Sequence, residues 1–136
     1  MTYTRWGEPT AGDIVWCHFP DYIHPHPKPR PALVLVVYND NAPPFEVCVA
    51  YGTSQRVTNL HGGESAILRD RNPAAYAAAG LSYDTNFDLK QTAILPYTIE
   101  WFTVPPGAPN GQNPKLGILH ASLMRALQAA ANAAEG

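Results

Sequence analysis

The chain contains little of the chemistry that marks several large protein classes. Only two residues are cysteine, Cys17 and Cys48, and no CxxC pair or zinc-ligand spacing is present. No apolar run approaches the roughly 20 residues of a membrane span, and residues 1–9 hold no apolar stretch of the secretory kind. We therefore expect a cytoplasmic protein with two buried, reduced thiols, no membrane partner and no bound metal.

Positive charge is also scarce. Nine Lys and Arg residues stand against eleven Asp and Glu residues, which gives a net charge of −2. A protein that binds duplex DNA by neutralising many phosphates is usually basic. The composition therefore argues against bulk neutralisation, while a local nucleic-acid site stays open.

The chain does contain short runs of β-forming residues, separated by loops that hold many of its 14 prolines. Residues 96–104 either continue the last predicted strand, Asp88–Leu95, or bend into a further one. Helices are expected at 73–79, with Gly80 as the cap, and at about 121–134. The predicted strands are Ile14–Phe19, Pro31–Val37, Phe45–Thr53, Ala66–Leu68 and Asp88–Leu95.

These elements indicate one domain over residues 1–136, in which residues 1–10 form a polar arm. We predict a mostly β fold with helices, namely an SH3-like small barrel with a C-terminal helix. The strand from Pro31 to Val37 does not alternate apolar with polar residues. Such a run is typical of a strand buried on both faces, so we place it at the centre of the core, paired with the next strand.

Arg30 stands directly before this strand, and the following Pro31 favours an extended backbone at Arg30. An arginine there cannot enter the core without a partner. Two interpretations stay open at this point. Arg30 forms a structural salt bridge, or its planar guanidinium holds a phosphate through two hydrogen bonds. Thr53, at the end of the third strand, is by itself most simply a cap or turn former.

Five segments together resemble the PemK/MazF family of toxin endoribonucleases, over roughly residues 11–130. The Gly-Asp pair in the first segment and the Arg-Pro pair in the second are the most specific parts. The segments are Gly12–Trp16, Arg30–Leu35, Val49–Ser54, Ala93–Tyr97 followed by Trp101, and Leu116–Leu119.

The resemblance implies an SH3-like barrel that forms a homodimer and cleaves single-stranded RNA without a metal or other cofactor. It also implies an antitoxin protein whose disordered tail covers the RNA groove. The arginine of the family's Arg-Pro strand is catalytic and matches Arg30, and the threonine after the third strand matches Thr53. Ser54, Gln55 and Lys28 lie within two residues of these positions and are the candidates for substrate binding.

Cleavage of RNA without a metal uses the 2′-hydroxyl of the substrate as the nucleophile. It needs a base, an acid and a cation at the phosphate. Arg30 supplies the cation, but its pKa is too high for easy proton transfer. Thr53 can hydrogen-bond the phosphate. His24 or His26 could transfer protons near neutral pH, and the alternative is that both are exposed loop histidines.

A second hypothesis is a catalytically silent barrel of the same fold that binds nucleic acid or a protein partner. It is favoured by the loop 22–29, which has neither the glycines nor the glutamate that are usual in the family. It is also favoured by the segment 98–100, which has no basic residue.

Overall fold

The computed structural model describes residues 6–20, 27–38 and 45–135. Residues 1–5 of the predicted polar arm lie outside this part of the chain. The strands are β1 (Asp13–Cys17), β2 (Arg30–Tyr38), β3 (Glu46–Thr53), β4 (Glu64–Ile67), β5 (Thr85–Pro96) and β6 (Lys115–Ile118). The helices are α1 (Pro73–Ala79), a 3-10 turn at Ala121–Leu123 and α2 (Met124–Glu135).

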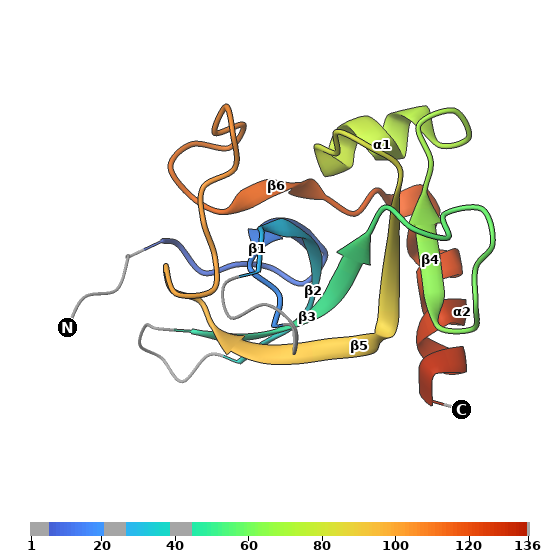
Figure 1. Ribbon diagram of the computed structural model, residues 1–136, viewed down its shortest axis with the longest axis horizontal. Helices are drawn as coiled ribbons and strands as arrows, with labels where there is room; N and C mark the ends of the chain where they lie inside the picture. Colours follow the sequence, from blue (N-terminus) through green and yellow to red (C-terminus); the bar gives the residue numbers. More distant parts are fainter. Residues whose placement is uncertain (1–5, 21–26, 39–44, 136) are drawn as a thin grey trace.

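The strands form a single antiparallel sheet in the order β4-β5-β3-β2-β1-β6. Figure 1 shows that this sheet curls into a half-barrel, with α2 standing beside β4 and β5. The predicted mostly β architecture with a C-terminal helix is therefore confirmed. No helix within the described residues is both long enough and apolar enough to cross a membrane.

Strand β2 lies in the middle of the sheet between β1 and β3. Ala32, Leu33 and Val34 are each at most 1% exposed, so neighbouring side chains are buried on opposite faces. The register with β3 shifts between Val34 and Val36, and exposed side chains alternate after that point. Burial on both faces is thus confirmed for the first half of the predicted strand and is wrong for the second half.

Alternate residues of the central strands supply two hydrophobic clusters. The cluster that α1 and the 3-10 turn help to form includes Ile14, Leu33, Ala50, Phe87, Ala75, Ala79 and Leu123. The other cluster includes Val15, Cys17, Ala32, Val34, Val49, Tyr97 and Phe102. Both cysteines are free, and Cys17 is buried as predicted, whereas Cys48 is only half-buried.

Helix α1 begins at Pro73, where a missing backbone N–H costs no helical hydrogen bond. It ends as predicted at Gly80, whose φ of +69° favours glycine and whose N–H donates to the Ala77 carbonyl at 3.1 Å. The prediction that residues 96–104 continue this strand or form a further one is wrong, because β5 stops at Pro96. The N–H groups of Trp101 and Phe102 both donate to the Thr98 carbonyl, which makes a turn instead.

Candidate functional site

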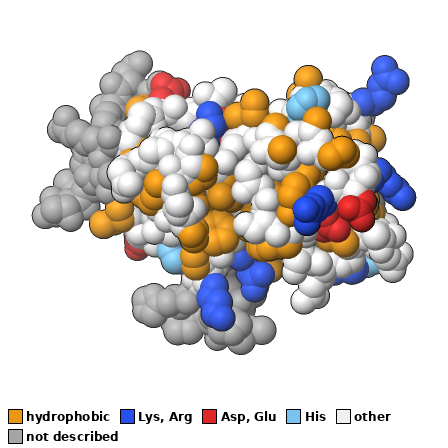
Figure 2. All heavy atoms as spheres, turned by 90° about the horizontal axis from the view of Figure 1, so that it is seen from above, with side chains coloured by type: hydrophobic (Ala, Val, Ile, Leu, Met, Phe, Trp, Pro, Cys, Tyr) orange, Lys and Arg blue, Asp and Glu red, His pale blue; other side chains and the backbone are white. Residues whose placement is uncertain are grey.

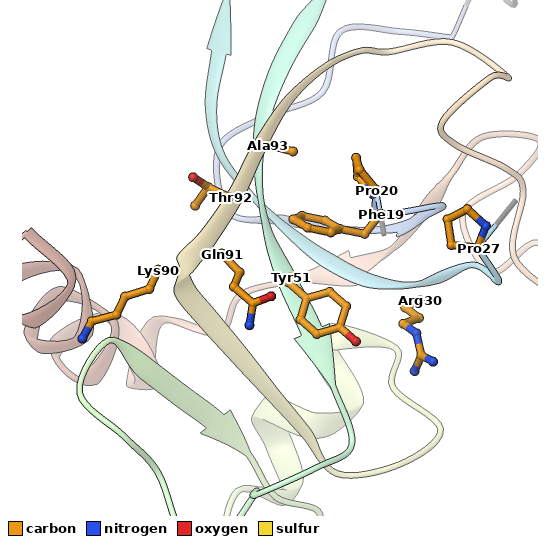
Figure 3. A pocket seen from close by; sticks show the side chains of 9 residues that line it. All are labelled: Phe19, Pro20, Pro27, Arg30, Tyr51, Lys90, Gln91, Thr92 and Ala93. Atoms are coloured by element: carbon orange, nitrogen blue, oxygen red, sulfur yellow. The ribbon is translucent and has the colours of Figure 1, made fainter. Parts of the chain in front are cut away.

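A groove of about 550 Å³ opens beside the start of β2, within the range of small-ligand sites, which is roughly 300–1,000 Å³. Its described lining contains two cationic side chains and no carboxylate, which favours an anionic ligand. Figure 3 shows the lining residues, which are Phe19, Pro20, Pro27, Arg30, Tyr51, Lys90, Gln91, Thr92 and Ala93.

The β2–β3 ladder relates Arg30 to Thr53. Ala32 pairs with Tyr51. Arg30 lies two residues before Ala32 on β2, and Thr53 lies two residues after Tyr51 on β3, so both are displaced towards the same end of this antiparallel pair. Side chains two residues apart on a strand share a face. Arg30, Tyr51 and Thr53 are therefore on the same face of the sheet, at the end that borders the groove.

Thr53 and Arg30 differ in exposure. Thr53 is buried, and its Oγ1 accepts a hydrogen bond from the Gln55 N–H at 3.2 Å, as in a turn. Thr53 is not part of the groove lining, whereas Arg30 is. The catalytic role of Thr53 stays a prediction, in which its hydroxyl would act from behind the residues that line the groove.

Arg30 is half-buried at the groove. No carboxylate within the described ranges forms an ion pair with Arg30, whereas Glu64 pairs with Arg56 and Asp13 with Lys115. The salt-bridge interpretation therefore has no support in this part of the chain. A half-buried guanidinium that no carboxylate pairs with can donate its hydrogen bonds to an anionic ligand.

Two aromatic side chains, Phe19 and Tyr51, line the groove together with Arg30. The rings of Phe19 and Tyr51 pack with centroids 5.2 Å apart and a tilt of 54°. Burial raises the pKa of Tyr83, and the positive charge of Arg30 partly offsets this rise, so Tyr83 also lies near Arg30. These aromatic neighbours could not be predicted from the sequence, because Tyr83 is distant along the chain and Tyr51 is typical of any strand.

An irregularity in β5 adds Lys90 and Gln91 to the groove. Ala50 of β3 pairs with Thr92, but the next residue, Tyr51, pairs with Asp88. Residues 89–91 therefore have no partner on β3, and β5 bends there, as Figure 1 shows. Lys90 is a cation that sequence reasoning missed, because a lysine in a strand normally marks a solvent-exposed position.

The remaining predicted site residues are dispersed. Lys28, Ser54 and Gln55 are exposed, and none of them lines the groove. His24 and His26 lie outside the described residues. The residues that flank this segment, Pro20 and Pro27, both line the groove.

His18 holds the chain in place at Pro27, directly after this segment. Its Nδ1 lies 2.8 Å from the carbonyl oxygen of Pro27. This contact joins the end of β1 to the chain just before Arg30. It therefore helps to define the wall of the groove on the side of Arg30.

The loop after β3 is fixed by buried polar groups. Glu64 of β4 pairs with the Arg56 guanidinium and accepts the His61 N–H at 2.6 Å. Burial raises the pKa of Glu64, but the His61 amide and the Arg56 side chain outweigh that effect and hold it below its ordinary value. Asn86 of β5 donates to the Gln55 carbonyl at 3.4 Å, and its Oδ1 is buried without a partner in the described part of the chain.

Within residues 6–20, 27–38 and 45–135, no cluster of three or more His, Cys, Asp and Glu side chains could hold a metal ion. No protein-family model matches the chain, and no curated protein matches it.

Proposed function

We propose that the protein is a PemK/MazF-like endoribonuclease, the toxin of a toxin–antitoxin pair, built on an SH3-like barrel. The observation that carries this proposal is Arg30, which lines a groove without a carboxylate partner among the described residues. Aromatic rings and a second cation line the same groove. Positive charge combined with aromatic side chains is the usual surface for single-stranded nucleic acid.

In the proposed reaction, the 2′-oxygen of a ribose attacks the adjacent phosphorus and the P–O5′ bond breaks. The products are a 2′,3′-cyclic phosphate and a 5′-hydroxyl. A base takes the 2′ proton, and an acid gives a proton to the leaving 5′-oxygen. Arg30 donates hydrogen bonds to the phosphate oxygens as negative charge builds on them.

The other assignments follow the resemblance. His24 or His26 transfers the protons, and Thr53 hydrogen-bonds the phosphate. Lys28, Ser54 and Gln55 contact neighbouring parts of the RNA. A homodimer and an antitoxin protein complete the proposal, and the positive groove favours an acidic segment of the antitoxin.

A second candidate function is a silent barrel that binds single-stranded RNA. The observation that favours it is the absence of histidine, aspartate and glutamate from the described lining of the groove. General acid–base catalysis near neutral pH ordinarily uses one of these side chains. This candidate differs from the first only in whether the bound RNA is cut.

The test uses end-labelled RNA of mixed sequence, incubated with purified protein in EDTA. We expect cleavage that leaves cyclic phosphate ends, and no cleavage of 2′-O-methyl RNA. Arg30→Ala should lower the rate by at least about 100-fold, as the loss of one transition-state donor does elsewhere. Arg125→Ala, on the exposed side of α2, is the matched control and should cleave normally.

Each outcome separates the candidates. Tight binding without cleavage by the wild type would favour the silent barrel. Cleavage that survives Arg30→Ala would remove Arg30 from the reaction. If the wild type neither binds nor cleaves RNA, both functions are wrong.

A further inference from the structure

The orientation of the Gln91 side chain is determined by a buried carboxylate. Asp88 is 7% exposed; its Oδ1 accepts the Lys90 N–H at 2.9 Å, and its Oδ2 accepts from Gln91 Nε2 at 2.9 Å. An ionised carboxylate only accepts hydrogen bonds, so the amide nitrogen of Gln91 must face Asp88. This contact resolves the usual ambiguity between the two ends of an amide.

The same contact determines what Gln91 can offer a ligand. One of its two N–H groups is used by Asp88, which leaves one donor and the Oε1 acceptor. A side-chain amide of this kind matches a nucleobase edge that carries an acceptor beside a donor. Gln91 lines the groove, so a base that enters the groove can reach it.

Tyr51 supplies an aromatic surface for such a base. It pairs with Ala32 on one side and with Asp88 on the other, so the ring and the carboxylate that orients Gln91 are neighbours in one ladder. In Figure 3, Gln91 and Tyr51 lie between Lys90 on one side and Arg30 on the other. A nucleotide placed there would have its base beside Tyr51 and cations on either side for phosphates.

We propose that Tyr51, Gln91 and Asp88 form a nucleobase subsite, in which a base of single-stranded RNA stacks on Tyr51 and Gln91 reads its Watson–Crick edge. Asp88 is a positioning residue that orients the Gln91 amide. The proposal rests on the proposed function in so far as the ligand is RNA. It adds the position that selects the base, and it does not require cleavage.

The test uses 2′-O-methyl heptamers with one base at the centre and abasic positions elsewhere, so that only one position can be read. Binding of the A, C, G and U versions is measured by fluorescence anisotropy. We expect the wild type to separate the best from the worst base by roughly tenfold or more, as one bidentate contact does. Arg30→Ala should weaken all four heptamers by a similar factor and keep their ratios.

Variants at the subsite should change the ratios. Gln91→Leu should bring the four affinities together. Asp88→Asn is isosteric and should change the preference, because the new amide can donate to Gln91 and reverse the orientation of the Gln91 amide. Gln128→Leu, on α2, is the matched control and should behave as the wild type does.

A loss of folding in Asp88→Asn is detected by circular dichroism, and Gln91→Leu then carries the test alone. Equal losses for all four bases in Gln91→Leu would overturn the subsite. Cleavage of RNA by a wild type that shows no preference among the heptamers would overturn the subsite and leave the endoribonuclease standing. Base-selective binding without cleavage would support the subsite and contradict the endoribonuclease. If the wild type binds none of the four heptamers, the subsite is wrong.

Discussion

Gly52 controls how closely β3 approaches β2 beside the groove. A Cβ atom at this position would meet the carbonyl oxygen of Pro31 and would lie 3.0 Å from Cε1 of Phe87. Pro31 directly follows Arg30, so any movement that made room for a side chain would also move the arginine. One missing side chain therefore fixes the position of the cation that the proposed function needs.

We expect Gly52→Ala to lower the free energy of unfolding by about 1–3 kcal/mol, because overpacking displaces backbone. It should also weaken the binding of RNA heptamers. Urea unfolding and anisotropy measure the two effects. Gly7→Ala is the control, since a Cβ there has no atom of the described residues within 4 Å. Identical behaviour of the two variants would contradict this account of Gly52.

At the scale of elements, β5 connects the parts of the site. Its second half pairs with β3 over the apolar core, and its first half pairs with both β3 and β4. The bend at 89–91 brings Lys90 and Gln91 to the groove, and Asp88 holds both. Beside it, Glu64 of β4 fixes the loop that follows Thr53.

Glu64→Gln tests this support of the loop. The folded-state pKa of Glu64 lies below its ordinary value, so its stabilising effect is complete above about pH 4.3. That effect is lost as the pH falls through the lowered pKa. We expect the variant to be less stable by about 1–3 kcal/mol at pH 7. The difference should shrink below about pH 4.3.

Urea unfolding from pH 7 down to pH 3 measures the effect. Glu46→Gln, at the exposed first residue of β3, is the control and should show no such difference. A difference for Glu64→Gln that stays constant with pH would mean that the carboxylate charge is not what holds the loop.

Much of the architecture could be predicted because it depends on local patterns. The apolar run of β2, its pairing with β3 and the Gly80 cap of α1 all follow from neighbouring residues. Lys90 and Gln91 could not be found in this way, because their place in the groove depends on a register shift between β3 and β5. The burial of Thr53 likewise depends on strands that are distant in sequence.

At the scale of the whole molecule, charged groups are sparse. In Figure 2, hydrophobic side chains (orange) and uncharged surface (white) cover most of the face shown, and charged side chains occur singly or in small groups. One apolar row crosses three strands, since Val36 of β2 pairs with Cys48 of β3, which pairs with Ile94 of β5. Val36 is 44% exposed and Ile94 57% exposed. We propose this row as the contact of the homodimer that the family resemblance implies.

Ile94→Glu should therefore convert a dimer into a monomer, because it places a charge in an apolar interface. Sedimentation equilibrium should show the wild type at twice the mass of one chain and the variant at that of a single chain. Ile99→Glu is the matched control, because Ile99 is also 57% exposed and lies outside the row. A wild type that is monomeric at all concentrations contradicts the proposed dimer.

The two outermost strands of the sheet are short. β4 and β6 are four residues long each, and β4 also contacts α2. A long edge would offer unpaired N–H and C=O groups to another chain and promote fibril growth. The most apolar strand, β2, instead lies in the interior of the sheet. We therefore expect little strand addition at β4 and β6, and any such addition to begin at the second half of β5, which pairs with β3 but not with β4.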